Sequence, residues 1–91
     1  MKVKNITNTK GNKIKNQFII KTNDSLVFQS YDSVIVEIRN CYHENKKIFL
    51  DEKYWNYSTT TSKYRNIFLE ESTEETQKKI DSGEYILTNL N

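Results

Sequence analysis

The sequence predicts an α+β domain in which a mostly antiparallel β-meander precedes two short helices and a C-terminal strand. Three observations support this fold class. Short segments with alternating apolar and polar residues, typical of strands, fill most of the chain before residue 51. Beyond them, Tyr64, Ile67 and Phe68 follow the i, i+3, i+4 spacing of one helical face. A serine followed three residues later by glutamate, at 72–75, marks the start of a second helix.

Five strands are expected in the first half of the chain, at residues 2–9, 14–22, 26–30, 34–39 and 47–50. Gly11 lies between the first two and can take the positive φ that a tight hairpin requires. The clearest alternation is at 34–39, where β-branched residues favour a strand over a helix. We expect Val34, Val36 and Ile38 to share the inward face of this strand.

Residues 54–69 carry the only tryptophan and three of the six tyrosines. Ser58, Thr59 or Thr60 can cap a helix here, because a side-chain oxygen satisfies a free backbone N–H. Five bulky residues are expected to fasten this helix to the sheet: Trp55, Tyr57, Tyr64, Ile67 and Phe68.

The second helix is expected to begin at the capping box and to end before Gly83, which can take the left-handed conformation of a helix end. It offers little apolar surface beyond Ile80, so we expect it to pack at the periphery. Residues 85–90 alternate again as a final strand. The chain of 91 residues is predicted to be one domain spanning 1–91.

Charge is distributed unevenly along a chain whose net charge is only +2. Residues 1–23 carry six lysines and no acidic residue, whereas residues 70–84 carry six acidic residues and two lysines. Such a separation can orient a partner, or the two groups can pair within the fold. The excess of lysine and asparagine also fits A+T-rich codons, which weakens lysine content alone as an indication of function.

Few residues suggest chemistry. Cys41 and His43 are the only cysteine and histidine, and they lie in a polar loop with no third ligand at metal-site spacing. Two glycines provide no phosphate-binding loop of either usual type. We therefore expect no enzymatic activity, no cofactor and no metal. A lone cysteine excludes an internal disulfide, and the lack of a long apolar stretch predicts a cytoplasmic protein that does not contact the membrane.

Two basic features could bind anions. At residues 58–65, hydroxyl groups and free N–H groups of a helix start lie near Lys63 and Arg65; alternatively the hydroxyls only cap the helix and both cations face water. The lysine-rich first hairpin, together with many tyrosines, resembles the composition of proteins that bind single-stranded nucleic acid. The candidate nucleic-acid-binding residues are Lys10, Lys13, Lys15, Lys63 and Arg65.

The acidic segment offers a different kind of surface. Carboxylates on a helix can imitate a nucleic-acid backbone and occupy a basic channel of a partner; the alternative is a solvated helix with internal charge pairs. The candidate partner-binding residues are Glu70, Glu71, Glu74 and Glu75.

Two stretches stand out by pattern. They are Phe28-Gln29-Ser30-Tyr31-x-Ser33-Val34-Ile35 and, twenty residues later, Trp55-x-Tyr57-Ser58-x-Thr60-Thr61-x-Lys63-Tyr64. Together they resemble a loosely defined family of small proteins encoded by phages, prophages and plasmids of low-G+C bacteria. The resemblance covers residues 14–70. Many such proteins have histidine where Tyr64 stands, which argues against chemistry that needs a side-chain base there.

The resemblance implies an accessory protein of a mobile element. Small phage proteins of this size include inhibitors of host defence, such as anti-CRISPR proteins, which act by stoichiometric binding. We therefore predict a non-enzymatic inhibitor of a host nucleic-acid-handling defence complex, a protein or ribonucleoprotein, in the cytoplasm of the bacterial host. A small nucleic-acid-binding module that uses the basic hairpin, and a phage assembly protein, remain as alternatives.

Overall fold

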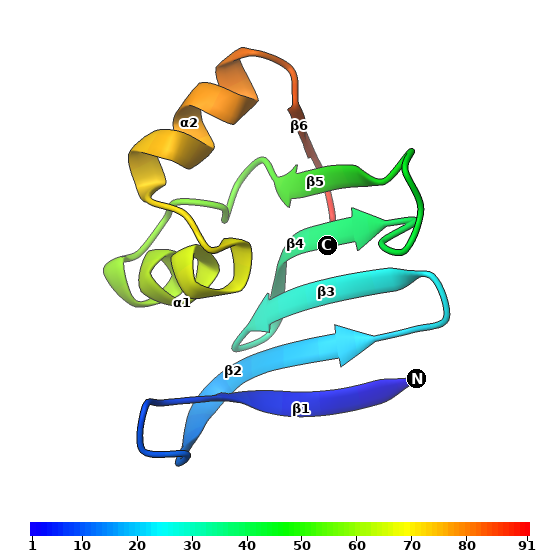
Figure 1. The fold of residues 1–91 in the computed structure, drawn as a ribbon. Helices are drawn as coiled ribbons and strands as arrows, with labels where there is room; N and C mark the ends of the chain where they lie inside the picture. The colour runs from blue at the N-terminus through cyan, green and yellow to red at the C-terminus, as the bar shows by residue number, and fades with distance from the viewer.

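The computed structural model describes residues 1–91 in full, and its strands form one six-stranded sheet (Figure 1). The strands lie side by side in chain order, and the first five form an antiparallel meander, as predicted. Their bounds are β1 (Lys2–Thr7), β2 (Lys13–Lys21), β3 (Ser25–Ser30), β4 (Ser33–Arg39) and β5 (Lys47–Asp51). The chain is thus a small α+β domain.

The two helices, α1 (Thr59–Leu69) and α2 (Thr73–Asp81), follow β5. In Figure 1, α1 lies beside β3 and α2 lies beside the last strand, β6. Ser58 caps α1, because its hydroxyl accepts a hydrogen bond from the N–H of Thr61 at 3.1 Å. The capping box predicted for α2 is present between Ser72 and Glu75, so both helix starts follow from local side-chain chemistry.

The final strand, β6 (Tyr85–Thr88), runs parallel to β5. A parallel neighbour needs a long crossover connection, which the two helices supply. The strand is shorter than the predicted 85–90, because the buried carboxylate of Asp51 accepts a hydrogen bond from the N–H of Leu90 at 2.9 Å. Burial alone would raise the pKa of Asp51, but N–H donors from Leu90, Tyr54 and Lys53 lower it below its usual value.

The hydrophobic core lies between the helices and one face of the sheet. Phe28, Val36 and Leu50 are opposite one another on three neighbouring strands, and all three are fully buried. Phe68 of α1 stacks on Phe28 with 5.7 Å between ring centroids. Ile80 of α2 also packs against this cluster, so both helices are held by the same core.

A β-bulge in β4 changes which residues face this core. Val36 pairs with Phe28 and Val34 with Gln29, which leaves Ile35 as the extra residue. Phe28 and Gln29 are adjacent in β3 and point to opposite faces, so Val34 and Val36 do as well. The prediction that Val34 shares the inward face of Val36 is therefore wrong, and Ile35 is fully buried instead.

The buried side of α1 also differs from the expectation. Its inward residues follow helical spacing and include two polar side chains: Thr61, Tyr64, Arg65 and Phe68. Ile67 falls outside this stripe and is 51% exposed, and Tyr57, which precedes the helix, is 50% exposed. Of the five predicted anchors, Trp55, Tyr64 and Phe68 pack against the core, whereas Tyr57 and Ile67 do not.

Candidate functional site

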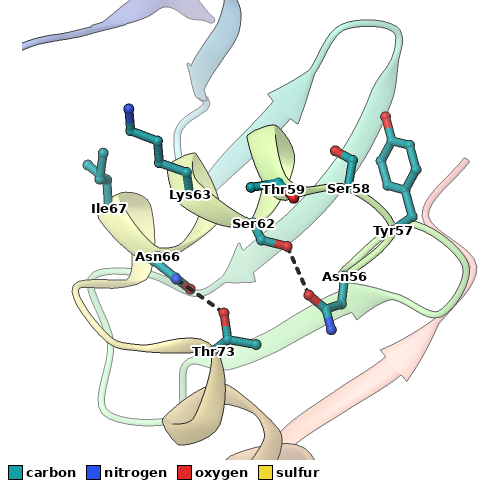
Figure 2. Close-up of a pocket in the computed structure, with 9 residues that line it drawn as sticks. All are labelled: Asn56, Tyr57, Ser58, Thr59, Ser62, Lys63, Asn66, Ile67 and Thr73. Carbon is teal, nitrogen blue, oxygen red and sulfur yellow. Dashed lines mark hydrogen bonds between the residues drawn. The ribbon is translucent and has the colours of Figure 1, made fainter.

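An open pocket of about 820 Å³ lies at the start of α1, where the sequence predicted an anion site (Figure 2). Hydroxyl and amide groups dominate its walls. Within them, the hydroxyl of Ser62 donates to Asn56 Oδ1 at 2.8 Å, and the amide of Asn66 donates to Thr73 Oγ1 at 3.2 Å. The lining residues are Asn56, Tyr57, Ser58, Thr59, Ser62, Lys63, Asn66, Ile67 and Thr73.

Arg65 is fully buried and donates hydrogen bonds to residues that line this pocket. Its Nη2 donates to Asn66 Oδ1 at 2.9 Å and to Thr73 Oγ1 at 2.8 Å. Its Nη1 donates to the carbonyl oxygen of Trp55, and the guanidinium lies 5.1 Å from the Trp55 ring centroid. The side chain therefore connects the segment before α1, the helix itself and the start of α2.

This placement removes Arg65 from the predicted nucleic-acid-binding set. Arg65 was predicted to lie on the surface, facing either water or an anion. In the structure its Nη1 and Nη2 atoms donate to neighbouring protein atoms, and its Nε is buried without a hydrogen-bond partner. Burial lowers the pKa of Arg65, and attraction to Glu71 opposes that shift. Arg65 lies four residues after Thr61, a spacing that places both side chains on the same, buried face of α1. A search for apolar residues at helical spacing does not find Arg65, because its side chain is charged.

Lys63 is the exposed cation of this region. It lies on the rim of the pocket at the α1 start and also lines a smaller hollow shared with the β1–β2 hairpin, where Thr7 and Ile14 are its neighbours. The structure therefore brings Lys63 next to the β1–β2 hairpin.

The lysines of the first two strands and their hairpin are all exposed. The ion pairs of the structure join Arg39 with Glu37, and Lys79 with Glu71 and Glu84, so these lysines have no ion-pair partner. The lysines of residues 1–23 therefore form no ion pairs with the acidic residues of 70–84. The unpaired set is Lys2, Lys4, Lys10, Lys13, Lys15 and Lys21.

Glu71 points into the protein, with its side chain only 3% exposed. Its carboxylate accepts hydrogen bonds from Lys79 Nζ at 2.8 Å, Tyr85 Oη at 2.7 Å and Thr76 Oγ1 at 2.5 Å. Burial raises the pKa of this carboxyl, but the three donors together lower it below its usual value. Burial and Glu71 in turn raise the pKa of Tyr85 to about 12.

The exposed acidic surface therefore contains only three of the four predicted glutamates. Glu70, Glu74 and Glu75 are exposed, whereas the carboxylate of Glu71 is occupied by internal donors. Glu75 also closes the capping box of α2, and Glu70 ends α1 in the left-handed conformation with φ of 58°. We call Glu70, Glu74 and Glu75 the acidic corner. It lies at the α1–α2 junction, away from β1 and β2 (Figure 1).

Cys41 and His43 lie in the loop between β4 and β5. No group of three or more His, Cys, Asp or Glu side chains that could hold a metal ion occurs in the structure. None of the helices has the length and apolarity needed to cross a membrane.

The fold and these surfaces define a small α+β domain with a lysine-rich sheet edge and an acidic helical corner. The chain belongs to the DUF8033 family, a family of unknown function whose model matches residues 1–84. The match includes the strands β1 to β5 and both helices. No curated protein and no solved structure matches the chain.

The Arg65 network predicts that lysine cannot replace arginine at this position. Arg65→Lys keeps the charge but replaces two separated donor nitrogens with a single ammonium. One ammonium cannot reach the Trp55 carbonyl on one side and Asn66 and Thr73 on the other, so at least one buried acceptor loses its donor. We expect the free energy of unfolding to fall by about 2–4 kcal/mol, measured by urea denaturation at neutral pH. Lys63→Arg, at an exposed site two residues away, serves as the control and should change stability by less than about 0.5 kcal/mol. Equal stability of the two variants would contradict the structural role of Arg65.

The Glu71 network predicts a pH-dependent contribution to stability. Because the folded state lowers the pKa of Glu71, its contribution is complete above the unfolded pKa of about 4.3 and is lost as the pH falls through the folded value. Glu71→Gln should reduce the free energy of unfolding by about 1–3 kcal/mol at pH 7. In urea titrations this difference from the unsubstituted chain should shrink steadily below about pH 4. A difference that stays constant across this pH range would show that Glu71 is not ionised in the fold.

Proposed function

We propose that the chain is a non-enzymatic accessory protein of a mobile element that binds a host nucleic-acid-handling complex stoichiometrically, as an inhibitor of the anti-CRISPR class. The resemblance of the Phe28–Ile35 and Trp55–Tyr64 stretches to phage and plasmid proteins supports the genomic setting. The observation that carries the proposal is the separation of two unpaired charged surfaces across a small domain.

The two surfaces match the two components of a protein–nucleic acid complex. Exposed carboxylates at the acidic corner are complementary to the basic residues that such a complex presents to its nucleic acid. The unpaired lysines of β1 and β2 are complementary to phosphates. An acidic surface alone would favour simple mimicry of nucleic acid, whereas the free lysines favour a protein that contacts both components.

The acidic corner can be tested without disturbing the fold. Glu70→Lys and Glu74→Lys reverse two exposed charges, and Glu75→Gln removes a third charge while glutamine still closes the capping box. Glu71 is left unchanged. A matched control makes the same charge change at exposed acids elsewhere, with Glu44→Lys, Glu52→Lys and Asp32→Asn.

The expected result is relief of CRISPR interference by the unsubstituted chain. Bacteria with an active effector of each main type are transformed with a targeted plasmid, with and without expression of the protein. We expect the yield of transformants with at least one effector type to approach that of a non-targeted plasmid. The control variant should retain this effect and the acidic-corner variant should lose it, because opposite charges at the interface become like charges.

Titration of the purified effector tests stoichiometric action. Inhibition should be complete at a fixed molar ratio of chain to effector. Inhibition by much smaller amounts would indicate catalytic turnover and contradict the non-enzymatic part of the proposal. Absence of relief with every effector type would overturn the anti-CRISPR assignment.

A further inference from the structure

A groove of about 670 Å³ opens at the end of the sheet that the helices leave uncovered. Its floor is formed by Ile19 and Leu26 and its rim by three lysines, while Tyr42 reaches in from the loop between β4 and β5. No carboxylate lines it. We call this hollow the lysine groove, and its cationic residues are Lys2, Lys4 and Lys21.

The strand register explains why these lysines converge. Lys2 is directly opposite Lys21, and Lys4 is opposite Ile19, so all four side chains lie on one face of β1 and β2. Like charges directly opposite each other destabilise a sheet. None of the three lysines has a carboxylate partner to relieve this repulsion. An anionic ligand in the groove would relieve it.

Tyr42 supplies an aromatic surface beside these cations. The loop that carries it is fixed to the β2–β3 turn, because the N–H of Cys41 donates to the carbonyl oxygen of Asp24 at 3.0 Å. Tyr42 is 62% exposed, and Lys21 Nζ lies 5.5 Å from the centroid of its ring. A flat apolar group can therefore stack on an exposed ring next to positive charge.

We propose that the lysine groove binds single-stranded nucleic acid, with a base against Tyr42 and the apolar floor and the phosphates at Lys2, Lys4 and Lys21. An aromatic platform beside a basic groove is the arrangement by which proteins bind single strands. A duplex keeps its bases stacked inside, so it offers none to this ring. The inference deepens the proposed function and rests on it for its setting, since it assigns the groove to the nucleic acid of the host complex.

A polymer fits better than a small anion. Lys10, Lys13 and Lys15 continue along the same hairpin, and they too lack ion-pair partners. Lys63 adds one more exposed cation where α1 meets the hairpin. A single phosphate would occupy only part of this surface, whereas a strand leaving the groove can follow the β1–β2 hairpin.

The test uses the purified full chain and fluorescently labelled oligothymidine of about 12 nucleotides. Affinity is measured between about 50 and 200 mM salt, and log K is plotted against log salt concentration. The groove variant carries Lys2→Gln, Lys4→Gln and Lys21→Gln. The charge-matched control carries Lys47→Gln, Lys53→Gln and Lys78→Gln, at exposed positions outside the groove.

The groove variant should bind with a slope shallower by about 2, because each phosphate contact contributes about 0.7 for a single strand. The control variant should retain the slope of the unsubstituted chain. Tyr42→Ala should weaken binding roughly 5- to 150-fold with little change in slope, whereas Tyr42→Phe should bind normally because it keeps the stacking surface.

Four results would overturn the inference: no binding at the lowest salt, equal slope changes in the groove and control variants, unchanged affinity of Tyr42→Ala, or displacement by polyglutamate as effective as by unlabelled oligothymidine. Different results would contradict the proposed function and the groove assignment. Binding through the groove without relief of interference would contradict the inhibitor role alone, and relief of interference without oligothymidine binding would contradict the groove assignment alone.

Discussion

The guanidinium of Arg65 is buried among polar groups from both sides of α1, and the arrangement of the helical half depends on it. A buried charge without hydrogen-bond partners is costly, so the partners must be held in fixed positions. Arg65 thereby sets where the segment around Trp55 enters α1 and where Thr73 begins α2. Glu71 has a similar positioning role on the other side of the α1–α2 junction. Its carboxylate accepts hydrogen bonds from Lys79 of α2 and Tyr85 of β6, and so holds these two elements together.

These two buried charges determine which surfaces remain for binding. Both belong to candidate sets that the sequence placed on the outside, yet Nη1 and Nη2 of Arg65 and the carboxylate of Glu71 are engaged within the protein. What stays free is a sheet edge with unpaired lysines and a small acidic corner at the α1–α2 junction. The most distinctive stretch of the sequence, 54–69, therefore organises the fold, while the charged surfaces around it are available to partners.

Local patterns were sufficient to predict the order of strands and helices. Alternation identified the meander, and the Ser72–Glu75 capping box identified the start of α2. Features that depend on distant neighbours were not predicted. The bulge at Ile35 arises from pairing with β3, and the parallel direction of β6 arises from the path of two helices over the sheet. Charge suggests exposure, so the inward direction of Arg65 and Glu71 was hidden, and the approach of Tyr42 to Lys21 needs a loop contact that no local pattern encodes.

We propose that nucleic acid binds at the lysine groove rather than at the pocket where α1 begins. Backbone amide chemical shifts of the ¹⁵N-labelled chain, followed by NMR during titration with oligothymidine, test this most directly. Shift changes should concentrate in β1, β2 and the loop that carries Tyr42, with little change from Asn56 to Thr73. Changes concentrated around Ser58, Ser62 and Asn66, or no changes at all, would contradict binding at the lysine groove.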